Sequence, residues 1–187
     1  YPFGADKHTA DNPLSNGKDV IDELRALYRD GSSGILPPAA FMVETIQAEG
    51  GVNVADKKWL QDLQALAKEV GSLFIIDDIQ AGCGRTGSYF SFDTLDLDPD
   101  VVCLAKGLGG WGTPMAMNLV KPEVDKHWKP GEHTGTFRGQ GLSFVAGAEA
   151  LSYFEDDSFM QTVLAKGKVM HEAIAPLEST FDDVQIR

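Results

Sequence analysis

Apolar and polar residues follow two spacings along the chain, one typical of helices and one typical of buried strands. Helices are predicted over four segments: 18–30, 56–70, 142–154 and 158–174. Asp56 is a plausible N-cap for the second of them. Short apolar runs predict four strands: 39–43, 73–76, 101–104 and 115–120. Strands that alternate with helices in this way predict an α/β fold with a mostly parallel sheet covered on both faces.

The composition is that of a folded domain. The 187 residues are 43% apolar, enough to bury the core of one domain, or of one domain and part of another. Acidic residues outnumber basic ones by 28 to 16, and the basic residues are scattered, which argues against a nucleic-acid surface. No apolar run approaches the roughly 20 residues that a membrane span needs. The four histidines lack metal-ligand spacing, and the two cysteines form no disulfide framework, so we expect a cytoplasmic protein without a metal.

Charged residues follow three of the predicted strands at the point where each strand ends. They are Glu44 and Glu49 after the first strand, Asp77 and Asp78 after the second, and Lys106 after the third. Ligands of open parallel sheets bind beyond the carboxyl ends of the strands, so these groups are predicted to share one crevice. A lysine placed there can form a Schiff base with a carbonyl. Pyridoxal phosphate uses such a lysine together with an acid for its pyridine nitrogen, and Lys106 and Asp77 suit those two roles.

Four motifs resemble those of class III, pyridoxal-phosphate-dependent aminotransferases, in the same order and spacing. They are residues 43–51 (VETIQAEGG), 74–87 (FIIDDIQAGCGRTG), 100–107 (DVVCLAKG) and 133–137 (HTGTF). The resemblance implies the large domain of the aspartate aminotransferase-like fold (fold type I), present in part, with pyridoxal 5'-phosphate as the cofactor. Within the family, the motifs are most similar to those of the diaminobutyrate–2-oxoglutarate branch, which serves ectoine synthesis.

The resemblance assigns roles to residues at the predicted crevice. Lys106 is expected to form the Schiff base and Asp77 to hold the pyridine nitrogen, with Ile79 against the cofactor ring and Gln80 bonded to its hydroxyl. Thr136 is expected to reach the phosphate of a neighbouring subunit's cofactor, which implies at least a homodimer.

The two glutamates after the first strand have supporting roles in this interpretation. The resemblance implies that Glu49 is a movable gate, paired with an arginine outside these residues. Glu44 ends a buried strand and therefore needs polar partners, so we expect it to support the site.

Several features depart from the family pattern. Asp78 stands where most members have glutamate, Thr45 where many have proline, and residues 138–141 (RGQG) where Gly-Gly-Asn-Pro is usual. The chain also starts at Tyr1 without a methionine. We expect residues 1–187 to be the central and C-terminal part of the cofactor-binding large domain, with 157–187 leading toward a small domain. The family's N-terminal segment and small domain are expected to lie outside these residues, and the fragment alone is expected to be inactive.

The branch resemblance predicts transfer of an amino group from glutamate to aspartate 4-semialdehyde, giving L-2,4-diaminobutyrate and 2-oxoglutarate. The 4-aminobutyrate, ornithine and acetylornithine enzymes share the same gross motifs and remain alternatives. Gly82-x-Gly84-x-x-Gly87 also fits a dinucleotide-binding pattern, although no amphipathic helix follows it. A catalytically silent fragment or interaction module is the third alternative.

Overall fold

A four-stranded sheet organises the protein in the computed structural model, which describes residues 17–136, 138–181 and 186. The sheet has the order β1 (Ala40–Val43), β4 (Leu73–Asp77), β5 (Val101–Leu104) and β6 (Met117–Val120). The first three strands are parallel, and β6 runs antiparallel to β5. A separate antiparallel pair joins β2 (Ile46–Gln47) to β3 (Asn53–Val54). The predicted strands are therefore confirmed, and the sheet is mostly parallel.

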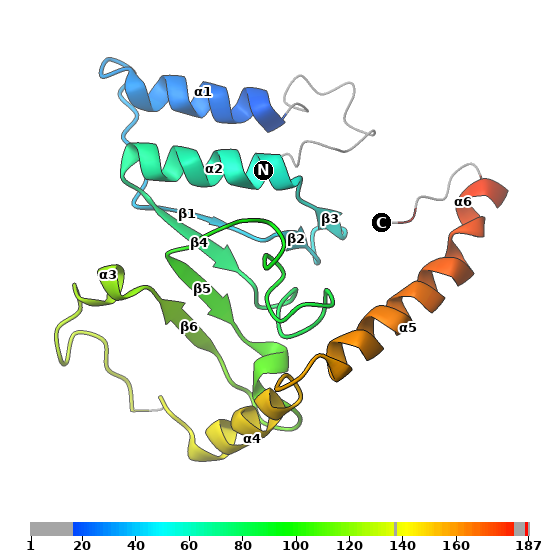
Figure 1. Cartoon of the computed structure of the whole chain (residues 1–187). Coiled ribbons are helices and arrows are strands. Elements are labelled where there is room, and N and C mark those ends of the chain that lie inside the picture. The colour runs from blue at the N-terminus through cyan, green and yellow to red at the C-terminus, as the bar shows by residue number, and fades with distance from the viewer. Residues whose placement is uncertain (1–16, 137, 182–185, 187) are drawn as a thin grey trace.

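Helices precede and follow the parallel strands, as the apolar spacing predicted. Two long helices, α1 (Gly17–Arg29) and α2 (Lys57–Val70), lie on the same side of the sheet (Figure 1). After β5 come a short 3-10 helix (Lys106–Gly109), then α3 (Pro122–Asp125), α4 (Gly141–Ser152), α5 (Ser158–Ile174) and α6 (Pro176–Thr180).

The ends of α2 follow from its sequence. The Asp56 carboxylate accepts the backbone N–H of Trp59 at 2.9 Å, which confirms Asp56 as the N-cap. The helix ends at Gly71, whose φ of 75° lies in the left-handed region that a residue without Cβ enters without strain. Because β4 begins two residues later, this turn returns the chain directly to the sheet.

The main core forms between α2 and the sheet. Leu60, Leu63 and Leu66 are fully buried and face Phe74 and Ile76 of β4 within one apolar cluster. Each buried side chain of this size contributes about 1.5–3 kcal/mol of transfer free energy. The edge of the Tyr28 ring packs against Phe41, with ring centroids 6.2 Å apart, and so joins α1 to β1.

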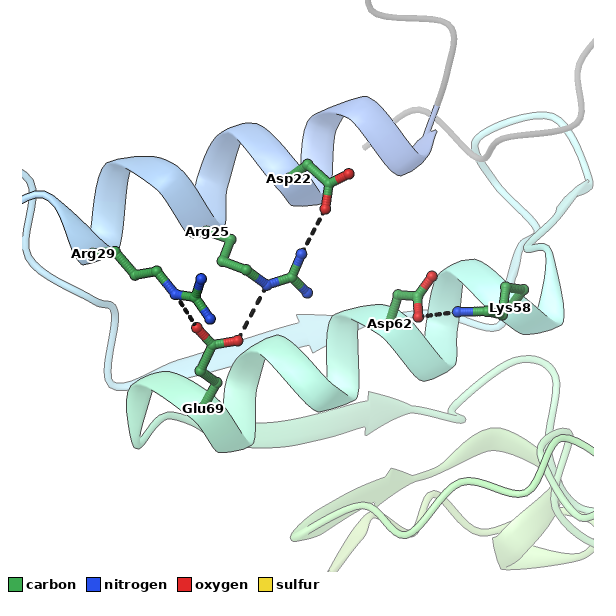
Figure 2. A network of polar contacts seen from close by, with 6 residues as sticks. All are labelled: Asp22, Arg25, Arg29, Lys58, Asp62 and Glu69. Carbon is green, nitrogen blue, oxygen red and sulfur yellow. Dashed lines mark hydrogen bonds and ion pairs between the residues drawn. The ribbon is translucent and has the colours of Figure 1, made fainter.

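Ion pairs bind α1 to α2 along their exposed sides (Figure 2). Glu69 of α2 accepts a hydrogen bond from Arg29 at 2.6 Å and another from Arg25 at 3.1 Å, and Arg25 also pairs with Asp22. Hydrogen bonding from Arg29, with Arg25 in support, lowers the pKa of Glu69. These exposed pairs fix how the two helices align rather than supply much stability.

The two faces of the sheet differ in cover. Phe41, Ile76 and Leu104 point to the covered face and are buried, whereas Met42 on the other face is half exposed. In the described part of the chain, the long helices α1 and α2 cover one face only (Figure 1), and α5 contains no buried residue. The expectation that helices cover both faces is therefore not met within the described residues. No helix in this part of the chain is long and apolar enough to cross a membrane.

Shortening a core leucine of α2 tests this packing. We expect Leu63→Ala to lower the free energy of unfolding by about 2–5 kcal/mol, because the fully buried site would leave a cavity. Leu36→Ala, at a side chain that is 86% exposed, should change it by less than about 0.5 kcal/mol. Urea unfolding of the protein that contains this chain measures both values, and equal midpoints for the two variants would contradict the packing described here.

Candidate active site

The strand register brings the predicted site residues to one edge of the sheet. Val43 pairs with Ile76, so Glu44 at the end of β1 comes beside Asp77 at the end of β4. Asp77 in turn pairs with Cys103 of β5, three residues before Lys106. These residues lie at the carboxyl ends of three parallel strands, where open α/β sheets bind their ligands.

Lys106 has an unusual backbone conformation. Its φ is 51°, in the left-handed region that residues with a Cβ rarely enter, and it begins the 3-10 helix directly after β5. Such conformations cost about 1–3 kcal/mol and gather at functional sites, where surrounding structure holds them. The exposed side chain then leaves the sheet at its carboxyl edge.

A side-chain amide joins the lysine to a glutamate from a distant segment. The Lys106 Nζ donates a hydrogen bond to Oε1 of Gln80 at 2.5 Å, and Nε2 of Gln80 donates to Oε1 of Glu49 at 3.3 Å. An ammonium group offers only donors and a carboxylate only acceptors, so the two bonds fix the orientation of the amide between them. The structure thus brings together three residues that sequence analysis nominated separately.

Asp77 is oriented by the turn that follows β4. Its Oδ1 accepts the backbone N–H of Ile79 at 3.1 Å, which holds the side chain beside the strand end. Strand-end aspartates often cap a following helix. Here residues 79–96 form turns and bends, with no helix, so Asp77 is not a helix cap. Its carboxylate lies close enough to Glu44 to raise the pKa of that residue.

The carboxylates at this edge act on one another. Burial raises the pKa of Glu44 above its ordinary value, and the nearby Asp77 and Glu49 carboxylates add to the rise, while Lys106 opposes it. Burial also raises the pKa of the Cys103 thiol, with a further contribution from Asp77. Sequence analysis assigned Cys103 no role at the site, and the strand register places it opposite Asp77.

Thr136 stands apart from the group. It is exposed, in the segment between α3 and α4, and within the described residues no hydrogen bond joins it to Lys106, Gln80 or Asp77. Its expected contact with a neighbouring subunit's cofactor stays a prediction.

The glycine motif at 82–87 packs against protein atoms. A Cβ on Gly84 would lie 2.7 Å from Cε of Met160, and one on Gly87 would lie 2.4 Å from a methyl group of Leu164. Because Gly84 and Gly87 lack a Cβ, side chains of α5 can pack against them. No helix begins inside the motif. A dinucleotide site needs a helix N-terminus at that place for its pyrophosphate, so the structure argues against that alternative.

Two further polar residues at this edge were missed by sequence analysis. The hydroxyl groups of Thr45 and Ser91 are 2.5 Å apart, and the Ser91 backbone N–H donates to the buried Asp78 carboxylate at 3.2 Å. Thr45 directly follows Glu44 and is itself buried, which is the signal that strand alternation could have given.

Fold and site together define an α/β enzyme domain with a lysine and an acid at the carboxyl edge of a parallel sheet. The chain belongs to the class III aminotransferase family, because the model of that family matches residues 5–187. The predicted family and the α/β fold are therefore confirmed, and pyridoxal phosphate is the cofactor that the family implies.

Known relatives cover most of this chain. Diaminobutyrate–2-oxoglutarate transaminase of Halalkalibacterium halodurans is 46% identical over 175 residues, which are 94% of this chain and 41% of that protein. The protein of the same name from Sporosarcina pasteurii is 48% identical over 160 residues, 86% of this chain and 37% of that protein. The predicted similarity to that branch is confirmed. The chain spans about two-fifths of the length of these relatives.

Solved structures agree with the fold. Acetylornithine aminotransferase from Elizabethkingia anophelis has a TM-score of 0.75 and 30% identity, covering 88% of this chain and 40% of that one. N-acetylornithine aminotransferase from Stenotrophomonas maltophilia has a TM-score of 0.73 and 28% identity, covering 92% of this chain and 42% of that one.

The residues present fit the cofactor of the family. Pyridoxal phosphate needs an amine for its aldehyde and an acid for its ring nitrogen. Lys106 supplies an exposed amine whose hydrogen-bond partner is a neutral amide, and no ion pair engages it within the described part of the chain. Asp77 supplies a carboxylate on the adjacent strand.

Replacing Glu44 tests the electrostatics of this edge. The folded protein disfavours the ionised form of a carboxyl whose pKa it raises. The free energy of unfolding therefore falls as the pH rises from the ordinary pKa of 4.5 through the raised pKa of Glu44. We expect Glu44→Gln to be the more stable protein at pH 7, by up to about 1 kcal/mol, and to equal the wild type at pH values well below 4.5. Urea unfolding across this pH range measures the difference. Glu23→Gln, at an exposed position of α1, is the control variant, and its stability should differ little from that of the wild type.

Proposed function

We propose that the protein containing this chain is an aminotransferase that moves an amino group from glutamate to aspartate 4-semialdehyde, giving L-2,4-diaminobutyrate and 2-oxoglutarate. The observation that carries the enzymatic part is the placement of Lys106 after β5, beside Asp77 at the end of β4. The substrate part is supported by several relatives named diaminobutyrate–2-oxoglutarate transaminase at about 46% identity. The amino acid and oxo acid or aldehyde substrates are small molecules.

Each side chain at the sheet edge has a role that its chemistry suits. When bound, pyridoxal phosphate supplies an aldehyde carbon and a ring that accepts the electron pair left by a departing α-proton. Lys106 would hold the cofactor through its Nζ at that aldehyde, and the same amine would serve as the base for the α-proton of the substrate. The Asp77 carboxylate holds a proton on the ring nitrogen. Ile79 packs against the ring, and Gln80 lies close enough to Lys106 to donate to the ring hydroxyl.

Two glutamates complete the proposed site. Glu44 supports it as a polar neighbour of Asp77. Glu49 serves as a gate: it pairs with an arginine outside this chain when the semialdehyde binds and leaves the arginine free for the distal carboxylate of glutamate. The bond of Glu49 to Gln80 is long and exposed, which suits a side chain that moves.

The wider organisation is part of the same proposal. Residues 1–187 form the central and C-terminal part of a cofactor-binding large domain, and 157–187 lead toward a small domain. Thr136 serves the phosphate of a neighbouring subunit, so the whole protein is at least a homodimer. The protein acts in the cytoplasm, where reduced cysteines are the rule.

Removing the amine tests the central role. In the full-length protein, we expect Lys106→Ala to lower turnover by on the order of 10²–10⁴-fold, because no other side chain replaces its proton transfer. Borohydride should fix the cofactor to the peptide that carries residue 106 in the wild type and not in the variant, as mass spectrometry would show. Lys68→Ala, at an exposed lysine near the end of α2, is the matched control and should retain both properties. Normal turnover in Lys106→Ala would rule out the assignment.

A panel of amino donors tests the substrate. We expect kcat/KM for 2,4-diaminobutyrate to exceed that for 4-aminobutyrate, ornithine and acetylornithine by at least about tenfold. Small differences in the contacts between substrate and site change kcat/KM by a factor of this size. The acetylornithine enzymes among the structural neighbours make that substrate the main competitor. A higher kcat/KM with any of the three would contradict the substrate and leave the aminotransferase activity standing.

A further inference from the structure

A buried polar network lies directly beneath the site. It joins Thr45, Ser91 and Asp78 through the 2.5 Å contact of the two hydroxyl groups and the 3.2 Å bond from the Ser91 N–H to Oδ2 of Asp78. Thr45 is 2% exposed and Asp78 is 0% exposed. The three residues come from the end of β1, the end of β4 and the loop before β5, so the network connects separate segments.

Strand alternation relates this network to the proposed catalytic residues. Successive side chains of a strand point to opposite faces of the sheet. Burial follows that rule past both strand ends, because Thr45 is buried next to the partly exposed Glu44, and Asp78 is buried next to the partly exposed Asp77. The network therefore lies on the covered side, while Glu44 and Asp77 lie on the side where ligands bind.

The network allows little movement at the end of β4. The Asp78 N–H donates to the carbonyl of Cys103 at 3.0 Å, and the Asp78 carbonyl accepts the N–H of Gly82 at 2.9 Å. A Cβ at Gly82 would lie 2.5 Å from Oδ2 of Asp78, so the turn is closed tightly onto the carboxyl. On the other side, the carbonyl of Thr45 accepts the N–H of Ala55 at 2.9 Å.

The carboxyl of Asp78 depends on Ser91. Its Oδ1 is buried without a hydrogen-bond partner, and no ion pair reaches it within the described residues. Burial raises the pKa of Asp78, hydrogen bonds from Ser91 oppose the rise, and the nearby Asp93 and Asp77 carboxylates add to it. A buried polar group with so few partners is costly to leave unsatisfied, so the bonds from Ser91 hold the carboxyl in one place.

We propose that Thr45, Ser91 and Asp78 are positioning residues that hold Asp77 and Glu44 side by side at the ends of β4 and β1. The inference rests on the proposed role of Asp77 toward the cofactor ring. Thr45 and Asp78 belong to two of the sequence motifs, at 43–51 and 74–87. The structure joins them through a third residue, Ser91, which lies outside those motifs.

Two substitutions at Thr45 separate the hydroxyl from the packing. Thr45→Val keeps the volume and removes the hydroxyl, whereas Thr45→Ser keeps the hydroxyl and loses a methyl group. The measurement is a pH titration of the ¹⁵N chemical shift of the ring nitrogen of bound pyridoxal phosphate in the full-length protein. If Asp77 moves away from the ring nitrogen, that nitrogen holds its proton less firmly. We therefore expect Thr45→Val to lower the midpoint by about half a pH unit, and Thr45→Ser to keep the wild-type midpoint.

Ser91→Ala and Ser72→Ala form a second pair, useful if Thr45→Val does not fold. Ser72 is also buried and donates to the carbonyl of Pro38, but at the opposite end of β4. We expect Ser91→Ala to lower the midpoint as Thr45→Val does, and Ser72→Ala to lose stability with an unchanged midpoint.

The outcomes distinguish a failure of the positioning role from a failure of the proposed function. Wild-type midpoints in both Thr45→Val and Ser91→Ala would overturn the positioning role while leaving the proposed function intact. A larger effect of Thr45→Ser than of Thr45→Val would overturn it as well, since packing rather than the hydroxyl would then matter. A wild-type protein that shows no absorbance of bound cofactor would contradict the proposed function and, with it, this inference.

Discussion

The parallel pairing of β1, β4 and β5 in one register is the constraint on which the rest of the site depends. Pairing of Val43 with Ile76 and of Asp77 with Cys103 brings three strand ends to one edge. Because side chains alternate along each strand, a shift of one residue in either pair would turn Asp77 or Glu44 to the covered face. The buried leucines of α2 resist such a shift, since they pack on Phe74 and Ile76 of the central strand.

The edge that this register creates combines several carboxylates with one lysine. The Gln80 side chain is hydrogen-bonded to both kinds of charged group, since it accepts a hydrogen bond from Lys106 and donates one to Glu49. A neutral amide in that position leaves the amine without an ion-pair partner, which suits a group that must react. Below the same edge, the hydroxyl groups of Thr45 and Ser91 extend polar contacts into the covered face. The site is thus ordered on both sides of the sheet.

Part of the apolar surface of this chain is exposed. The chain spans about two-fifths of the length of its curated relatives, and Met42 and much of α4 and α5 are exposed despite their apolar character. Within the described residues, no hydrogen bond joins Thr136 to Lys106. In the function proposed above, other segments of the protein or a second subunit would cover these apolar side chains and contact the cofactor phosphate.

The sequence by itself determined the elements of the fold. Apolar periodicity and caps are local properties, so Asp56 was identified as an N-cap and the strand at 101–104 was placed at its observed bounds. The sequence also nominated Lys106, Asp77, Gln80 and Glu49, because charged and polar residues that directly follow buried strands are visible in one dimension. Only the tertiary structure decided which of these touch: the bridge through Gln80 and the network of Thr45, Ser91 and Asp78 join residues 13 to 46 positions apart in the sequence, and Lys106 takes a left-handed backbone conformation. The same holds for Gly84 and Gly87, which fit a nucleotide motif in sequence and pack against side chains of α5 in space. Contacts of this kind depend on strand register and on the path of loops, which are set by packing across the whole molecule and leave no local signal in the chain.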